Sequence, residues 1–392
     1  MIKQYSIVTL SPTVWTPQKR KDIMEYNLRR IARQILAAKW ACEMELPVRL
    51  VVLPELAITG APDETRQMDH VQAAREIFID IPGEETDYLC RLCKKQGFYL
   101  VAQAKARDPE FMPDRFFNVS FIIDPEGKVI HKHRKTHVAV IESSVCPTDI
   151  WDIYVEKFGT DPKKLLEAIF PVAHTEIGNI GTLVCAEGAF PEAARALALN
   201  GAEIICRTAY LEPRTSAGIF EVQNRSHAVF NACYVISPNT GPVHSFPETY
   251  EDWRHAWPMD YSGNQSQIID YRGQIIGQHV GAVDYFTSAI INIEALRDYR
   301  LRTLIGSYSL RDLRVDQYSL IYKAAEAMGG IYPRNLYMDG LPLSNAEAIQ
   351  VRRYVQNKLV DKGICTPPSD WKPHKISKGI TQRIENAAVR ST

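Results

Sequence analysis

The chain has 392 residues, of which 45% are hydrophobic, so it is long enough to bury a large core. Its 46 basic residues balance its 46 acidic residues, and a general nucleic-acid binder would normally carry a basic excess. The N-terminal residues follow a strand pattern rather than that of a signal peptide, and no hydrophobic run is long enough to span a membrane. We therefore expect a cytoplasmic protein that binds neither nucleic acid nor membranes.

Strand and helix patterns alternate along the chain. A helix is predicted where Leu28, Ile31, Ile35 and Ala38 fall on one face. The predicted strands are Ser6–Leu10, Arg49–Leu53, Phe98–Ala102, Phe117–Ile123, Lys128–His131, Ala202–Cys206, Tyr234–Ser237, Gln267–Asp270 and Thr287–Ile293. This order predicts two α/β halves that could stack, although periodicity alone does not fix their topology.

Two stretches in the first half each end on a reactive side chain. A hydrophobic strand-like run leads to Pro54 and delivers Glu55 onto a turn. A second strand pattern leads to Lys135, and Glu142 follows seven residues later. A carboxylate can act as a general base, and a lysine ammonium can stabilise an oxyanion, so these residue types suit acyl transfer.

A third stretch presents a cysteine between a strand and a helix. The strand pattern of 180–184 ends at Cys185, a turn containing glycine follows, and Pro191 opens a helix that stops at Asn200–Gly201. A thiolate is the reactive form of cysteine, and a strand-to-helix turn can expose it among backbone N–H groups. Cys185 is therefore a candidate nucleophile, whereas Cys206 and Cys233 are expected to be ordinary buried side chains.

These residues also have more ordinary interpretations when each is taken alone. A single cysteine is usually a small buried hydrophobic residue, and a lone glutamate or lysine is usually a solvated surface charge. Only the ordered combination of Glu55, Lys135 and Cys185 favours a catalytic site.

No cofactor or metal is expected. The eight cysteines have no regular spacing, which predicts free thiols in a reducing compartment, and Cys90–Cys93 lies in a helical pattern without a second pair. His131, His133 and His137 could suggest metal, but the arginine and lysine between them disfavour a bound cation.

From about residue 7 to residue 293 the sequence resembles the nitrilase superfamily, the carbon–nitrogen hydrolases. Pro54–Gly60 looks like the first glutamate motif of that family, and His133–His137 resembles its lysine motif with His in place of Tyr. Further similarity lies in Asn231–Val235, at Asn239 and in Gly263–Gly273. The resemblance implies a four-layer α-β-β-α sandwich with a Glu-Lys-Cys triad at the ends of the sheets.

The resemblance also suggests roles for residues outside the triad. The position of Glu142 is similar to that of a second glutamate in the aliphatic amidase branch, although Glu126 or Glu187 could supply this carboxylate. The hydrolase domain is expected to cover residues 1–294. The extension 295–392 is expected to pack on a partner subunit of a homo-oligomer, or else to be a partly disordered tail.

The insertion Ser143–Pro171, which contains a predicted helix from Pro162 to Phe170, leaves directly from Glu142. It could form a wall of the substrate pocket or pack against a neighbouring subunit.

The implied reaction is hydrolysis of a small-molecule carboxamide through a Cys185 thioester. Many nitrilases carry Cys-Trp-Glu, whereas this chain has Cys185–Glu187 with alanine in the middle, which favours an amide over a nitrile. His227 and Phe230 depart from the family pattern and leave N-carbamoyl substrates open. A nitrilase is the main alternative, and a non-catalytic binding protein on the same fold is a further one. The sequence does not identify the acyl group.

Overall fold

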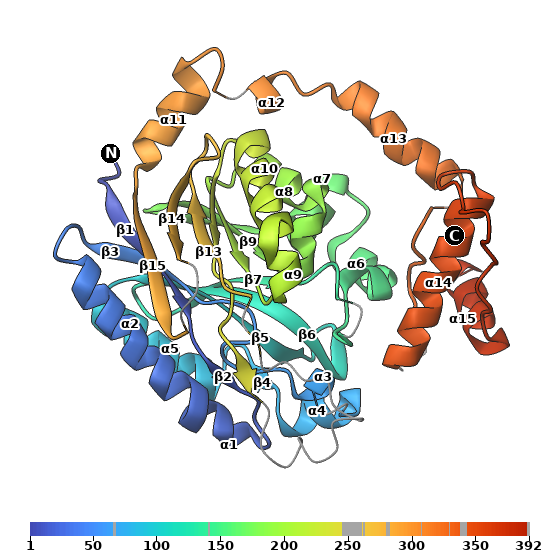
Figure 1. Ribbon diagram of the computed structural model, residues 1–392, viewed down its shortest axis with the longest axis horizontal. Coiled ribbons are helices and arrows are strands. Elements are labelled where there is room, and N and C mark those ends of the chain that lie inside the picture. Colours follow the sequence, from blue (N-terminus) through green and yellow to red (C-terminus); the bar gives the residue numbers. More distant parts are fainter. Residues whose placement is uncertain are drawn as a thin grey trace.

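The computed structural model describes residues 1–65, 68–139, 142–244, 261, 263–279, 283–306, 308–328, 330–337 and 343–389. Two β-sheets pack face to face, and helices cover the outer face of each sheet (Figure 1). This arrangement is the α-β-β-α sandwich that the sequence predicts. None of the helices in these ranges combines the length and hydrophobicity needed to cross a membrane.

The first sheet has the strand order β15-β1-β3-β5-β6-β7, with β4 beside β5. Its central strands β1, β3 and β5 are parallel, whereas β15, β6 and β7 join it through antiparallel pairs. The strand bounds are β1 Tyr5–Ser11, β3 Val48–Val52, β4 Ile79–Asp80, β5 Tyr99–Asp108, β6 Met112–Ile123, β7 Val129–Arg134 and β15 Tyr285–Ile291. Two antiparallel steps separate β5 from β7, so β3, β5 and β7 all run in the same direction.

The second sheet has the order β14-β13-β11-β10-β9-β8, and its centre, β9, β10 and β11, is parallel. Its strands are β8 Val172–Thr175, β9 Gly178–Val184, β10 Ile204–Thr208, β11 Tyr234–Ser237, β13 Ser266–Ile269 and β14 Ile275–His279. A separate pair joins β2 (Val14–Trp15) to β12 (Val243–His244).

Successive side chains of a strand point to opposite faces, and this period of two builds the layers. In β1, Ile7 packs between the sheets and Val8 packs under the helices. In β3, Val52 likewise packs between the sheets and Val51 packs under the helices. Strands buried on both faces need continuous hydrophobic runs, which explains why these segments are readable from the sequence.

The helices bury one face each against a sheet. On the first sheet lie α1 (Arg20–Asp22), the π-helix Ile23–Leu28, α2 (Arg29–Cys42), α3 (Pro62–Thr65), α4 (His70–Glu76) and α5 (Glu84–Gln96). Over the second sheet lie α8 (Pro191–Leu199), α9 (Pro213–Thr215) and α10 (Glu221–Asn231). All four residues predicted to share one helix face before β3 are buried, which confirms that prediction.

The insertion between residues 143 and 171 forms α6 (Trp151–Phe158) and α7 (Pro162–Ile169), and it contacts the C-terminal part of the same chain. The backbone N–H groups of Asn335 and Tyr337 donate to the carbonyls of Thr148 and Asp149 at 2.9 and 3.1 Å. The insertion is therefore tied to the extension, an arrangement that the sequence did not indicate.

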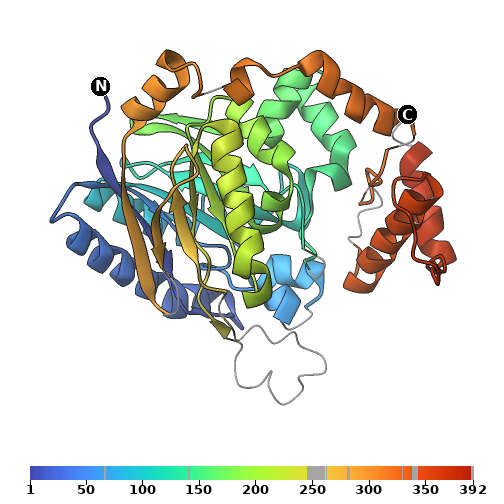
Figure 2. The same cartoon turned by 45° about the horizontal axis from the view of Figure 1, so that its top comes forward.

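Beyond β15 the chain leaves the sandwich as a series of helices. These are α11 (Ile293–Arg302), α12 (Tyr308–Arg311), α13 (Val315–Ala327), α14 (Asn345–Asp361) and α15 (Lys378–Val389). Figure 2 shows α11 to α13 crossing over the body of the molecule to reach α14 and α15 at its far side.

Candidate active site

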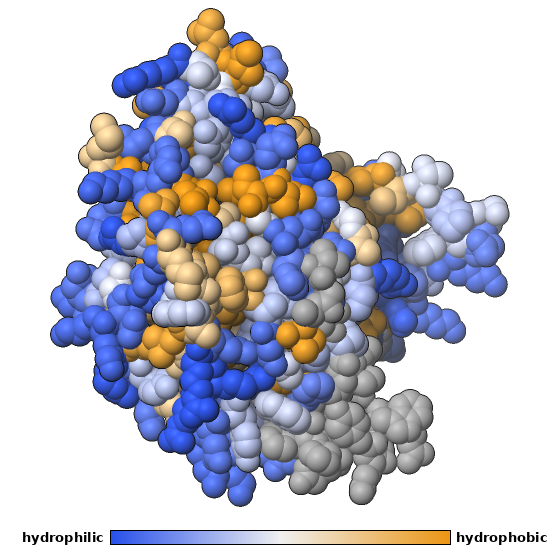
Figure 3. Space-filling view, turned by 60° about the vertical axis from the view of Figure 1, so that its left-hand side comes forward, coloured by the Kyte–Doolittle hydropathy of each residue, from blue (hydrophilic) through white to orange (hydrophobic). Residues whose placement is uncertain are grey.

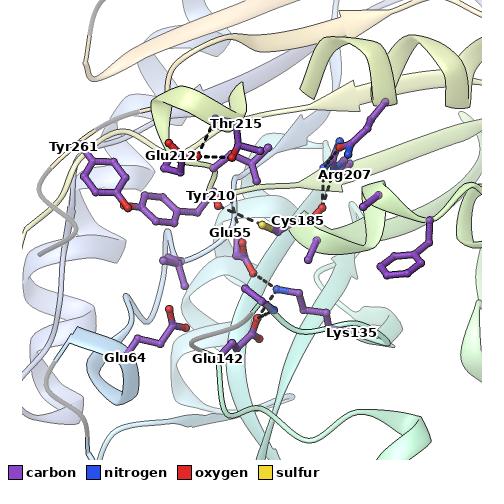
Figure 4. A pocket seen from close by; sticks show the side chains of 17 residues that line it. Glu55, Glu64, Lys135, Glu142, Cys185, Arg207, Tyr210, Glu212, Thr215 and Tyr261 are labelled. Atoms are coloured by element: carbon purple, nitrogen blue, oxygen red, sulfur yellow. Dashed lines mark hydrogen bonds and ion pairs between the residues drawn. The ribbon is translucent and has the colours of Figure 1, made fainter. Parts of the chain in front are cut away.

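The structure brings all four predicted side chains to one cavity at the ends of the strands. Glu55 follows β3, Lys135 directly follows β7, and Cys185 directly follows β9. Glu142 reaches the same cavity from the loop after Lys135. Figure 4 shows Glu55, Lys135 and Glu142 joined by polar contacts, with the sulfur of Cys185 directed toward Tyr210.

Lys135 lies between two carboxylates. Its Nζ donates to Glu55 Oε1 at 2.8 Å and to Glu142 Oε2 at 2.6 Å, and all three side chains are buried. Burial opposes the charge of Lys135, but Glu142 and Glu55 outweigh it and raise its pKa well above the usual value. Burial likewise opposes the charge of Glu142, yet Lys135 and Lys105 lower its pKa. Lys135 and Glu142 are therefore both charged at neutral pH.

Asn118 joins the two carboxylates on their other side and was not predicted from the sequence. Its Nδ2 donates to Glu55 Oε1 at 2.9 Å and to Glu142 Oε1 at 2.8 Å. Gln103 donates to Asn118 Oδ1 at 2.6 Å and so fixes the orientation of this amide. The available signal was a polar residue on an otherwise hydrophobic strand.

Cys185 occupies a strained turn and carries a buried thiol. Its φ of 47° lies in the left-handed region, which costs free energy for any residue other than glycine. Burial raises the pKa of its thiol, the negative charge of Glu55 raises it further, and Lys135 and Arg207 oppose this. The resting thiol is thus protonated at neutral pH, and reaction requires a base to remove its proton.

The backbone of Tyr210 connects the candidate nucleophile Cys185 with Glu55. The Cys185 thiol donates to the Tyr210 carbonyl at 3.2 Å, and the Tyr210 N–H donates to Glu55 Oε2 at 3.1 Å. Glu55 and Cys185 are therefore neighbours on either side of one residue, close to where a substrate carbonyl would lie.

Of the two alternative carboxylates, neither lies beside Lys135. Glu187 is buried, and its oxygens lie 2.9 and 3.0 Å from His133 Nε2. Burial opposes its ionisation, but His133 and hydrogen bonds from Thr136 lower its pKa to about 2. Glu126 is exposed on the turn between β6 and β7. Glu142 is thus the second carboxylate beside Lys135.

His131 and His227 are packed as neutral groups outside the cavity. Burial lowers the pKa of His131 to about 3, and its Nε2 lies 3.1 Å from the Thr182 hydroxyl. His227 faces the Gly188 carbonyl at 2.9 Å, and burial followed by Arg207 lowers its pKa to about 4. Phe230 is half exposed, so neither departure from the family pattern touches the cavity through the described residues.

A second buried ion cluster adjoins the first. Lys105 Nζ contacts both oxygens of Asp63 at 2.7 and 2.8 Å and Glu64 Oε1 at 2.5 Å. Burial raises the pKa of Glu64 to about 8, with Lys105 opposing and Asp63 adding to the shift. Glu64 also lines the cavity (Figure 4), so it presents a protonated carboxyl group there at neutral pH.

The cavity has a volume of about 390 Å³, near the lower end for small-molecule sites. Leu56, Phe190 and Tyr210 contribute hydrophobic surface beside the charged groups. None of the described residues that line the cavity comes from the insertion 143–171. The insertion therefore does not form a wall of the pocket through the described residues, as the sequence had suggested it could.

Comparison with known proteins places most of the sandwich in one family. Residues 14–293 match the carbon-nitrogen hydrolases, and the chain belongs to that family. The structure is similar to that of a carbon-nitrogen hydrolase from Helicobacter pylori G27, with a TM-score of 0.60 and 19% sequence identity. The alignment covers 81% of this chain and 98% of the other. The predicted superfamily is thus confirmed.

Two curated relatives differ in the reaction they are named for. The chain is 30% identical over 205 residues to a nitrilase of Pyrococcus abyssi, covering 52% of this chain and 63% of the relative. It is 28% identical over 223 residues to a formamidase of Bacillus thuringiensis, covering 57% and 58%. The matches thus span less than two thirds of these relatives' length.

Proposed function

We propose that this hydrolase cleaves the C–N bond of a small carboxamide through a thioester on Cys185. The observation that supports it best is the position of Glu55, which shares the Tyr210 backbone with Cys185 and a hydrogen bond with Lys135. A base, a cation and a thiol converge on a cavity large enough for a small amide.

The first half of the reaction forms the acyl-enzyme. Glu55 takes the Cys185 proton, and the sulfur adds to the amide carbonyl carbon. Lys135 and the backbone N–H of Ala186 hold the resulting oxyanion. Glu55 then returns the proton to the departing ammonia or amine, and a thioester remains.

The second half releases the acid. Glu55 removes a proton from water, the water oxygen adds to the thioester carbonyl, and the sulfur leaves as the thiol once it regains that proton. Glu142 keeps Lys135 in place during both halves, because its carboxylate holds Nζ at 2.6 Å. Its role is positioning rather than proton transfer.

Two further observations bear on substrate and compartment. The formamidase relative and the alanine after Cys185 favour an amide, whereas the nitrilase relative supports nitriles as the second candidate. All eight cysteines are free thiols, which favours a reducing compartment, and we propose the cytoplasm.

Ammonia release tests the substrate class. Purified protein is offered matched amides, nitriles and N-carbamoyl compounds of increasing acyl size, alongside Cys185→Ala and Cys365→Ala, the latter removing an exposed thiol. We expect release from small amides that persists in the Cys365 variant and is lost in the Cys185 variant. Release from nitriles alone would replace the amidase proposal with the nitrilase. Silence on every compound, with Cys185 unreactive toward iodoacetamide, would favour a binding protein.

A further inference from the structure

Arg207 holds the backbone of the candidate nucleophile. It lies on β10, and its side chain is the largest of the fully buried ones. Its Nε and Nη2 both donate to the Cys185 carbonyl, at 3.0 and 2.8 Å. Its remaining contacts are to the amide oxygens of Gln223 and Asn224, each at 2.8 Å. Figure 4 shows the guanidinium on the opposite side of Cys185 from Glu55.

The charge of Arg207 is not balanced by an ion pair. Within the described part of the chain, its acceptors are one backbone carbonyl and two amides, none of them a carboxylate. A buried cation without a counter-ion is costly, and neutral side chains could hold a backbone carbonyl at lower cost. Burial lowers the pKa of Arg207 to about 10, so the group is still charged at neutral pH. The charges of Glu55 and Glu187 also favour the guanidinium, but neither carboxylate is hydrogen-bonded to it, and a negative charge on Cys185 would favour it more than either.

The proposed reaction places a negative charge on Cys185. In the resting state, Lys135 is already flanked by Glu55 and Glu142, so this trio carries one net negative charge. Proton transfer from Cys185 to Glu55 moves that charge onto the sulfur. The sulfur belongs to the residue whose carbonyl Arg207 holds. A cation in a water-poor site stabilises such a charge far more than it would in water.

The surroundings prevent Arg207 from moving away. A Cβ added to Gly188 would lie 2.0 Å from the Arg207 Cζ, so only glycine leaves room for the guanidinium. On its other side the Phe220 ring centre lies 4.9 Å away. The side chain is thus fixed against a turn whose first residue, Cys185, has a left-handed φ.

We propose that Arg207 is a positioning residue that fixes the strained Cys185 turn through its carbonyl and stabilises the thiolate formed during catalysis. This inference rests on the proposed role of Cys185 as nucleophile. It goes beyond the proposed function because it assigns a function to a second cation, on the side of Cys185 away from Lys135.

The test measures the alkylation rate of Cys185 by iodoacetamide as a function of pH, with peptide mass mapping to separate it from the other thiols. Arg207→Met removes both the charge and the hydrogen bonds. Arg207→Lys keeps the charge but cannot donate two hydrogen bonds from Nε and Nη2 to the Cys185 carbonyl. Arg300→Met is the matched control, because Arg300 also donates to backbone carbonyls, at 2.8 Å to Ala202 and Ala232, beside the non-catalytic Cys233. Thermal unfolding and kcat are recorded for each variant.

We expect Arg207→Met to slow alkylation at pH 8 by about tenfold or more and to move its pH midpoint upward by about one unit. Arg207→Lys should keep the wild-type midpoint but react more slowly, and kcat should fall in both. Arg300→Met should lower the melting temperature without changing the reactivity of Cys185.

Unchanged alkylation in a folded Arg207→Met protein would overturn the inference, as would equal losses in Arg207→Met and Arg300→Met. If Arg207→Met does not fold, a wild-type alkylation rate in Arg207→Lys overturns it instead. Failure of the proposed function looks different, because Cys185 would then be unreactive in the wild-type protein itself.

Discussion

Lys135 makes its two ion pairs with carboxylates that have different tasks. Glu55 faces the thiol through Tyr210, so it is free to exchange a proton during the reaction. Both carboxylates accept a hydrogen bond from Asn118, but Glu142 also accepts one from the Ser144 hydroxyl at 2.9 Å, which helps to fix its orientation. The two carboxylates are chemically identical, so the proposed roles of base and support rest on their different neighbours.

Replacement of Glu142 by Gln should therefore reduce turnover without removing the chemistry. The variant loses the charge that holds Lys135, and we expect kcat to fall by about a hundredfold, the usual cost of a misplaced catalytic group. Steady-state amide hydrolysis measures this, and Glu126→Gln on the exposed turn is the control. Wild-type turnover in the Glu142 variant would contradict the support role.

Glu64 should make stability depend on pH. Its folded pKa of about 8 lies above the value of about 4.5 that it regains on unfolding. The folded state then binds one proton more than the unfolded state between these values, so its contribution to stability is present at low pH and is lost as pH rises to 8. Compared with Glu64→Gln, the wild-type protein should lose up to about 1.4 kcal/mol of unfolding free energy per pH unit in this window.

Urea denaturation of both proteins from pH 5 to pH 8.5 measures this difference. A difference that does not vary with pH, or that grows as pH rises, would show that Glu64 is ionised in the folded protein.

The sequence was sufficient to predict the reactive side chains that follow strands, but not the residues that hold those side chains in place. Glu55, Lys135 and Cys185 stand out because a reactive side chain ends a hydrophobic run. Asn118 and Arg207 lie within such runs, and their partners come from other strands and helices distant in sequence. Choosing Glu142 over Glu187 likewise required knowing that His133 and Thr136 surround Glu187.

Among the elements, the turn from Cys185 to Ala189 connects the two sheets. Glu187 accepts hydrogen bonds from the backbone of Val184 at 2.6 Å and of Thr136 at 2.8 Å. It thereby joins the end of β9 to the end of β7, and so sets the nucleophile against Lys135. We therefore expect its buried charge to hold the geometry of the site rather than to transfer a proton.

Gly188→Ala tests how tightly this turn is packed. The new methyl group would collide with Arg207, which four hydrogen bonds hold in place, so we expect a loss of about 1–3 kcal/mol in unfolding free energy together with reduced kcat. Gly379→Ala, at an exposed position of α15, is the control, because no atom lies within 4 Å of its added Cβ. A Gly188 variant as stable as wild type would mean that Arg207 can move aside.

Strands and helices could be predicted where the hydrophobic pattern of their own side chains marks them. Both faces of β1 and β3 are buried, so their hydrophobic runs are unmistakable. β5 and β7 extend beyond the predicted ends, because Lys105 and His133 are charged or polar residues whose buried partners lie elsewhere. Tertiary contacts thus decided the boundaries.

At the scale of the whole molecule, the helices after β15 expose much hydrophobic surface. α13 buries none of its side chains, and even its hydrophobic residues Leu320 and Ile321 are 62% and 59% exposed. Figure 3 shows further hydrophobic side chains on the face that carries β15 and α11, where Phe286 and Leu301 are exposed. Exposed surface of this kind is typical of an interface.

We therefore expect a homodimer or larger assembly in which a second copy covers α13. Light scattering after gel filtration should give a mass above that of one chain, and Leu320→Glu with Ile321→Glu should reduce it. Lys323→Glu changes the charge of the same helix without removing hydrophobic surface and should leave the mass unchanged. A monomeric wild-type protein would contradict this expectation.

The extension 295–392 remains the part of the chain that sequence described least. Its link to the insertion depends on backbone hydrogen bonds such as that from Tyr337 to Asp149, which leave no pattern of side chains. The proposed domain boundary at residue 294 and the contact with a partner subunit stay predictions.

In the proposed mechanism, hydrolysis depends on the Cys185 thiol. The most direct measurement compares amide turnover by the wild-type protein with that of Cys185→Ala, using Cys365→Ala as the matched control. Loss of the nucleophile should reduce kcat at least about a thousandfold at unchanged melting temperature, while the control keeps wild-type turnover. Substantial amide hydrolysis by purified, folded Cys185→Ala would contradict the thioester mechanism.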